Sequence, residues 1–124
     1  MISASPYLII ENVQESLDYY RSVFGGEIRV LNEHKGKLLH AELHVGPSIL
    51  HFSDDYGKGR KTEQVSILLT LDQEADLRRI YEQLAADGGE VKVELQQTFF
   101  GALHGQVADV KNGITWVMNC FISN

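Results

Sequence analysis

Three histidines and a glutamate, side chains capable of acid–base or metal chemistry, lie in one short apolar stretch, residues 38–54, which reads LLHAELHVGPSILHFSD. His40, Glu42 and His44 alternate with apolar residues, and His51 follows after a Gly-Pro pair. Alternation with a period of two is typical of a strand that buries one face. Imidazole and carboxylate groups bind divalent cations, exchange protons near neutral pH, or pair with one another. Their arrangement in space decides among these roles.

A tight turn at Gly46-Pro47 predicts a hairpin of residues 38–45 and 48–53. In this register Glu42 lies opposite His51, with Cβ atoms about 4.5–5.5 Å apart. A carboxylate at this distance raises the pKa of an imidazole, whereas burial lowers it. The apolar face is expected to carry Leu39, Ala41, Leu43, Val45, Leu50 and Phe52, and the polar face His40, Glu42, His44, Ile49, His51 and Ser53. The polar face either contacts bulk water, with its groups paired to one another, or lines a ligand cavity.

The hairpin belongs to a pattern that occurs twice along the chain, in residues 7–30 and again in residues 67–93. Each copy begins with an apolar run and continues with a helix-period segment, and each expected helix ends at a Gly-Gly pair. Asn12 and Asp72 are the expected N-caps, and Glu15 completes a capping box in the first copy. The helices are expected to bury Val13, Leu17, Tyr20 and Phe24 in the first copy, and Leu77, Ile80, Tyr81 and Leu84 in the second.

Short strands, residues 27–31 and 90–95, follow the two helices. A second hairpin is expected from residues 105–110 and 114–121, with its turn near Asn112-Gly113. The unit is therefore βαβββ, used twice, and predicts a single α+β domain over residues 1–124. Module one covers about residues 1–54, a polar linker about 55–64, and module two about 65–124.

Composition narrows the classes of partner. The chain has 124 residues, 44% of them hydrophobic and 23% charged, and a formal net charge of −6. Nucleic acid is not an expected partner, because phosphate binding needs a basic face. No apolar run is long enough to span a membrane, and the N-terminus lacks the basic start of a signal peptide, so we expect a cytoplasmic protein with no membrane partner. The single cysteine, Cys120, excludes an internal disulfide and is expected to be a buried, inert thiol.

The duplicated unit, together with the segments SLDYYRSVFGGE, HAELHVGPSILHFSD and QTFFGALHGQVADVKNGITWVMNC, resembles the PhnB-like group of the vicinal oxygen chelate superfamily, which has the glyoxalase/bleomycin-resistance/dioxygenase fold. The resemblance covers nearly the whole chain. It implies two tandem βαβββ modules whose strands form a U-shaped, partly open mixed sheet around a cavity, with the helices outside, and it implies a homodimer. The superfamily includes metalloenzymes as well as bleomycin-binding proteins without catalysis, so the fold leaves the activity open.

The resemblance also locates the usual metal ligands, which come from the first and last strands of each module. They fall near Ser5 or Tyr7, and near His51, Ser66 and Val117. Of these, His51 is the one competent ligand for a transition metal. We therefore expect neither the usual metal centre nor another cofactor. A rearranged divalent-metal site made by His51, Glu42 and His40 is the alternative.

Aromatic and polar residues from both modules are expected to line the ligand cavity. These residues are Tyr7, Glu42, Ile49, His51, Ser66, Phe99, Phe100, His104 and Val117. The leading interpretation is a metal-independent protein that binds a small molecule of unassigned specificity. A metal-dependent lyase, isomerase or dioxygenase-type enzyme with a rearranged site at His51 and Glu42 is the second interpretation, and a dimeric scaffold with a vestigial cavity is the third. Whether the chain is an enzyme stays open at this point.

Overall fold

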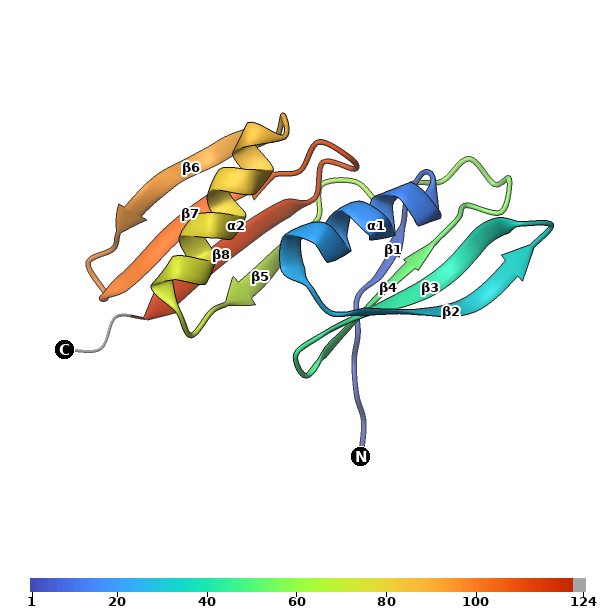
Figure 1. Ribbon diagram of the computed structural model, residues 1–124, viewed down its shortest axis with the longest axis horizontal. Coiled ribbons are helices and arrows are strands. Elements are labelled where there is room, and N and C mark those ends of the chain that lie inside the picture. The colour runs from blue at the N-terminus through green and yellow to red at the C-terminus, as the bar shows by residue number, and fades with distance from the viewer. Residues whose placement is uncertain (122–124) are drawn as a thin grey trace. The chain divides into compact units, whose positions relative to one another are not determined.

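The computed structural model describes residues 1–121, which form eight strands and two helices in the predicted order (Figure 1). The elements are β1 (Tyr7–Ile9), α1 (Val13–Phe24), β2 (Glu27–His34), β3 (Lys37–Val45), β4 (Ser48–Ser53), β5 (Ser66–Thr70), α2 (Glu74–Ala86), β6 (Glu90–Gln97), β7 (Ala102–Ala108) and β8 (Thr115–Phe121). This order confirms the βαβββ unit used twice. The chain divides into two compact units, residues 1–62 and 63–124, and each contains one four-stranded sheet.

The sheet of the first unit has the strand order β1-β4-β3-β2. The edge strand β1 runs parallel to β4, and the other neighbours are antiparallel, so the sheet is mixed. Val45 pairs with Ser48 across the Gly46-Pro47 turn, and Gly46 has a φ of 54°. The register predicted from this turn is therefore confirmed along the whole hairpin.

Helix α1 covers the apolar face of this sheet. The fully buried ring of Tyr20 stacks on that of Phe52 in β4, with ring centroids 5.3 Å apart. Val13 and Leu17 are buried as predicted, but in the last turn Val23 is buried and Phe24 is only half-buried. Phe24 lies one helical turn after Tyr20, and its ring stacks on the Tyr20 ring with centroids 6.2 Å apart.

The two helices begin differently. Asn12 is the N-cap of α1 as predicted, and its Oδ1 accepts a hydrogen bond from the Glu15 amide. The Glu15 carboxylate accepts from the Asn12 side-chain Nδ2 instead of the backbone N–H that a capping box uses. The predicted N-cap of α2, Asp72, is wrong, because the cap is Gln73, which makes no side-chain capping bond. Acidic residues in the first turn, among them Glu74, instead stabilise the positive end of the α2 dipole.

The sheet of the second unit has the order β5-β8-β7-β6, and α2 packs on the face that carries Gly105. A Cβ atom at Gly105 would lie 2.9 Å from the Tyr81 ring, so this glycine makes room for the helix. Leu77, Ile80 and Leu84 are buried as predicted, whereas Tyr81 is half-buried. Neither helix within residues 1–121 has the length and apolar character needed to cross a membrane.

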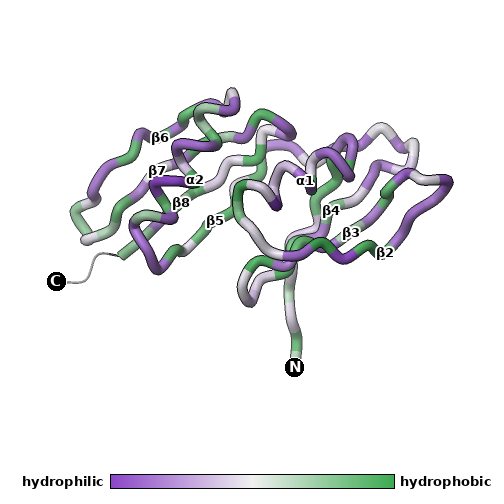
Figure 2. The backbone as a smooth tube through the Cα atoms, viewed as in Figure 1, coloured by the Kyte–Doolittle hydropathy of each residue, from purple (hydrophilic) through white to green (hydrophobic). Residues whose placement is uncertain are grey.

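The hairpin of the second unit is longer than predicted at its start and is organised by one buried carboxylate. Strand β7 begins at Ala102 instead of residue 105. Asp109 is 4% exposed, and its two oxygens accept hydrogen bonds from the Trp116 indole, at 2.9 Å, and the Asn112 amide, at 2.7 Å. Trp116 is therefore fixed on the helix side of the sheet. Figure 2 shows hydrophobic and hydrophilic residues interspersed along the strands, as half-buried sheets require.

Candidate functional site

The polar face of the first sheet lies opposite α1 and carries the chemically competent side chains. Strand β3 contributes His40, Glu42 and His44, and β4 contributes His51 directly opposite Glu42. The exposed side-chain fractions are 14% for Glu42, 23% for His51 and 33% for His44. These groups are sheltered yet accessible within their own unit.

Four of these side chains form one linked set, called here the histidine–glutamate network: His40, His51, Glu42 and His44. His40 Nε2 lies 3.0 Å from His51 Nδ1, and His51 Nε2 lies 3.3 Å from Glu42 Oε2. The second carboxylate oxygen, Glu42 Oε1, lies 3.0 Å from His44 Nε2. The carboxylate thus sits between two imidazoles, and a third imidazole extends the network on one side.

The chemistry of the carboxylate fixes the direction of these hydrogen bonds. An ionised Glu42 only accepts, so the Nε2–H group of His44 donates to it. The same carboxylate lies 3.3 Å from His51 Nε2 and favours a proton on that nitrogen. When this is the single proton of the His51 ring, Nδ1 is an acceptor and the His40 Nε2–H donates to it.

The charge states agree with this direction. The hydrogen bond from His44 lowers the pKa of Glu42, and the positive charge of Arg29, which lies opposite Glu42 on β2, adds to this effect. Burial and the neighbouring His51 lower the pKa of His40. Glu42 is consequently a carboxylate and His40 a neutral imidazole near neutral pH.

We expect the free energy of unfolding to decrease as the pH falls below about 6.5. His40 has a lower pKa in the folded chain than its ordinary value of 6.5, so the unfolded chain takes up this proton first. The stability contributed by His40 is complete above pH 6.5 and is lost as the pH falls toward the folded-state pKa. Glu42 adds a loss of the same sign below its ordinary value of 4.5.

Urea denaturation over this pH range, on the wild type and His40→Gln, measures the effect. The variant should show a smaller decrease in stability in the upper part of the range. Parallel pH profiles for the two proteins would contradict a lowered pKa at His40.

Tyr7 forms an aromatic wall beside the His40 end of the network. The parallel pairing of β1 with β4 places Tyr7 next to His51. Its ring centroid lies 5.3 Å from that of His40, edge to face, and 6.3 Å from that of His51, stacked. Tyr7 is 53% exposed, so one side of its ring is open to a ligand in this unit.

The donor atoms of the expected rearranged metal site, at His51, Glu42 and His40, contact one another in the structure. Both ring nitrogens of His51 and both oxygens of Glu42 already take part in the network. No group of three or more His, Cys, Asp or Glu side chains within residues 1–121 is arranged to hold a metal ion. A cation at His51 would first have to break the contact with His40 or the contact with Glu42.

The remaining predicted site residues lie in three places. Ile49 shares the polar face of the first sheet, opposite His44. Ser66, His104 and Val117 belong to the face of the second sheet that points away from α2. The structure thus brings together Tyr7, Glu42, Ile49 and His51 within the first unit and, separately, Ser66, His104 and Val117 within the second.

Phe99 and Phe100 lie in the turn between β6 and β7, where both are exposed. His104 has its own polar partners, since its Nδ1 lies 2.6 Å from Asn119 Oδ1 and its Nε2 lies 3.1 Å from Gln106 Nε2. A neutral ring satisfies both contacts by donating to Asn119 and accepting from Gln106. The hydrogen-bonded side chains Asn119, His104 and Gln106 of the second unit therefore include no carboxylate, in contrast to the histidine–glutamate network of the first unit.

Two members of the site were not selected from the sequence. His44 shares the predicted polar face, and its alternation with Glu42 was the signal that could have included it. Arg29 lies opposite Glu42 through the β2–β3 pairing. That pairing shifts register between Val30 and Asn32, so it could not be deduced from the alternation of residue types.

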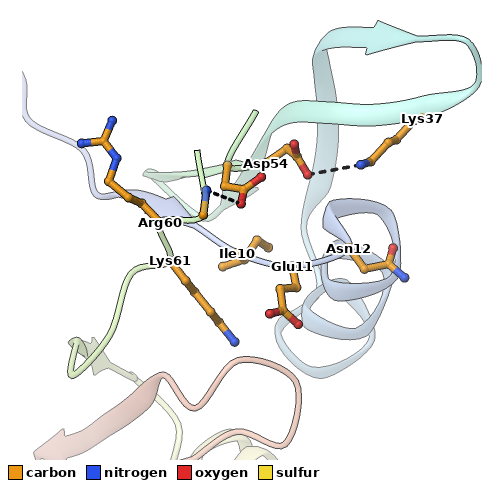
Figure 3. Close-up of a pocket in the computed structure, with 9 residues that line it drawn as sticks. Ile10, Glu11, Asn12, Lys37, Asp54, Arg60 and Lys61 are labelled. Atoms are coloured by element: carbon orange, nitrogen blue, oxygen red, sulfur yellow. Dashed lines mark hydrogen bonds and ion pairs between the residues drawn. The ribbon is translucent and has the colours of Figure 1, made fainter. Parts of the chain in front are cut away.

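A separate hollow of about 370 Å³ lies where α1 begins, beside the loop that follows β4 (Figure 3). Its lining residues are Ile10, Glu11, Asn12, Lys37, Asp54, Asp55, Gly59, Arg60 and Lys61. Asp54 is paired with Lys37 at 3.5 Å, and Asp55 accepts the amide hydrogens of Gly57 and Gly59. Both aspartates are thus engaged in holding the loop, and none of the residues predicted for the site lies here.

The chain belongs to the glyoxalase/bleomycin resistance protein/dioxygenase superfamily, whose sequence pattern matches residues 4–118. This match confirms the resemblance seen in the sequence. A comparison with curated proteins finds no match.

Solved structures share the fold over nearly the full chain. Protein PA1353 from Pseudomonas aeruginosa is 28% identical, with 98% of each chain covered and a TM-score of 0.81. A PhnB protein from Bacillus cereus is 22% identical, with 96% of this chain and 99% of that chain covered and a TM-score of 0.73. TnmS3, an antibiotic binding protein from Streptomyces sp. CB03234, is 16% identical, with 98% of each chain covered and a TM-score of 0.69. The last two comparisons establish a common fold.

Proposed function

We propose that this chain is a small-molecule-binding member of its superfamily and that it binds its ligand, without a metal ion, on the polar face of the first unit. The observation that carries this proposal is the position of the half-exposed Tyr7 ring beside the histidine–glutamate network. A flat apolar wall next to a few fixed polar groups is the usual composition of a small-molecule site. The antibiotic-binding relative TnmS3, which shares the fold, supports the same class of function.

The chemistry of the face indicates the kind of ligand. The open side of Tyr7 favours a planar aromatic group, which gains from stacking. The Glu42 carboxylate and the net charge of −6 favour a neutral or cationic ligand over an anionic one. We further propose, from the resemblance to PhnB-like proteins, that the chain acts as a homodimer in the cytoplasm. No observation on the described residues favours the metal-dependent alternative.

Ligand binding by the wild type, Tyr7→Leu and Tyr7→Phe tests the proposal. The probes are metal-free bleomycin and a panel of neutral and cationic planar aromatic compounds, screened by thermal shift in EDTA and measured by calorimetry. We expect binding in EDTA, a loss of roughly tenfold in affinity for Tyr7→Leu, and near wild-type affinity for Tyr7→Phe, since base–aromatic and ring stacking contribute on this order. An absence of binding across the panel, or binding that requires an added divalent metal, would contradict the proposal.

A further inference from the structure

The histidine–glutamate network has two ends, and only one of them reaches the Tyr7 wall. At that end His40 uses Nε2 to donate to His51, which leaves Nδ1 as its second polar atom. Within residues 1–121, Nδ1 makes no hydrogen bond and is not among the fully buried polar atoms that lack a partner. The nitrogen is therefore accessible to a bound molecule.

The role of this nitrogen follows from the other end of the network. The Glu42 carboxylate, 3.3 Å from His51 Nε2, favours the His51 tautomer with its one proton on that nitrogen. In this tautomer His51 Nδ1 accepts from His40 Nε2, and a neutral His40 carries its lone pair on Nδ1. The state of Nδ1 thus depends on the carboxylate on the far side of the His51 ring. In a neutral His51, reversing it would move the ring proton from Nε2, beside the carboxylate, to Nδ1.

The groups around His40 leave this lone pair uncommitted. Tyr7 contacts the His40 ring from β1, His51 contacts it from β4, and Glu42 acts on its charge from the same strand. Asn32, which lies opposite His40 on β2, donates its amide to the Tyr56 hydroxyl and is engaged elsewhere. Burial and the nearby His51 disfavour a charged His40 by lowering its pKa, which agrees with an acceptor at this position.

We infer that the site selects ligands that carry a hydrogen-bond donor. The ligand is a planar aromatic compound whose ring stacks on Tyr7 and whose O–H or N–H group, next to the ring, donates to His40 Nδ1. This inference rests on the proposed function. An analogue with the same ring but only acceptor atoms places a lone pair against a lone pair and leaves Nδ1 unpaired. Sites built to bond a hydroxyl or amine reject such analogues strongly.

The first test reads the ring nitrogens directly. Proton–nitrogen correlation spectra of the metal-free protein near neutral pH should show His40 as the Nε2–H tautomer, with a non-protonated Nδ1. A His40 ring that carries its proton on Nδ1, or on both nitrogens, overturns the inference whatever the protein binds.

The second test compares 2-naphthol with 2-methoxynaphthalene in EDTA, because the two probes share a ring system and differ in the donor hydrogen. We expect 2-naphthol to bind at least about tenfold more tightly. In His40→Phe, which keeps a flat ring but has no acceptor, the two affinities should become equal. In His34→Phe, a matched change at an exposed histidine near the end of β2, the preference should be retained.

The outcomes separate the inference from the function on which it rests. Equal binding of the two naphthalenes to the wild type, or a preference that persists in His40→Phe, overturns the inferred selection for a hydrogen-bond donor but leaves the proposed binding function intact. If neither naphthalene binds, the other panel compounds decide: binding of compounds that lack a donor group also overturns this selection. Failure of every compound in the panel overturns both.

Discussion

Replacing Gly26 with alanine is expected to destabilise the protein by more than about 3 kcal/mol. Gly26 has a φ of 90°, and a Cβ atom there would overlap the carbonyl oxygen of His44 in β3. The carbonyl belongs to the backbone of a central strand, so it cannot rotate aside as a flexible side chain could. The connection from α1 to β2 would have to move away from the strand that carries the network. Chemical denaturation measures the change, and accumulation of insoluble protein would agree with it.

Gly25→Ala is the matched control for this prediction. Gly25 also has a positive φ, 77°, but a Cβ atom there meets nothing within 4 Å. Its φ of 77° and ψ of −158° lie in a region that is essentially restricted to glycine, so its replacement measures the backbone strain alone, about 1–3 kcal/mol. If the two variants were equally stable, the close approach of Gly26 to His44 would not be a determinant of the fold.

Glu42→Gln is expected to disrupt the direction of the hydrogen bonds in the histidine–glutamate network and to weaken ligand binding by roughly tenfold or more. The two imidazoles that contact the Glu42 carboxylate would meet one amide oxygen and one amide NH₂ group. One of them, His44 or His51, must then change its tautomer or lose its partner. When His51 changes, the direction of its bond to His40 reverses and the acceptor at Nδ1 is lost. Calorimetry with the tightest panel ligand and the tautomer spectrum of His40 measure the two effects.

The charge lost in this variant needs its own control, which Glu33→Gln provides. Glu33 is an exposed residue of β2 outside the network, and its replacement changes the net charge by the same amount. This variant should bind the ligand like the wild type. Similar losses of affinity in both variants would mean that long-range attraction, and not the network, favours the ligand.

Much of the site geometry could be predicted because it depends on local chain geometry. A two-residue turn at Gly46-Pro47 and the period-two alternation together determine which residues of the hairpin face each other. The opposition of Glu42 and His51 followed from these two facts. His40 and His51 are diagonal neighbours on the same face of the hairpin, so the same register also predicts their contact.

The parts that could not be predicted depend on contacts between distant segments. The parallel pairing of β1 with β4, which brings Tyr7 to His51, joins segments that no turn connects. The β2–β3 pairing contains register shifts, so the position of Arg29 opposite Glu42 was not available from a pattern. Asp72 was a plausible N-cap by residue type, but helix α2 begins after Gln73 and relies on its acidic first turn.

The most direct measurement of the central claim is a ligand titration of the wild type in EDTA, followed through the side-chain nitrogens of its five histidines. If the polar face of the first unit is a metal-free binding site, the ring nitrogens of His40 and His51 will shift on addition of the tightest panel ligand, and those of His34 will not. Shifts that leave His40 and His51 unchanged, or that occur only after a divalent metal is added, would contradict the account.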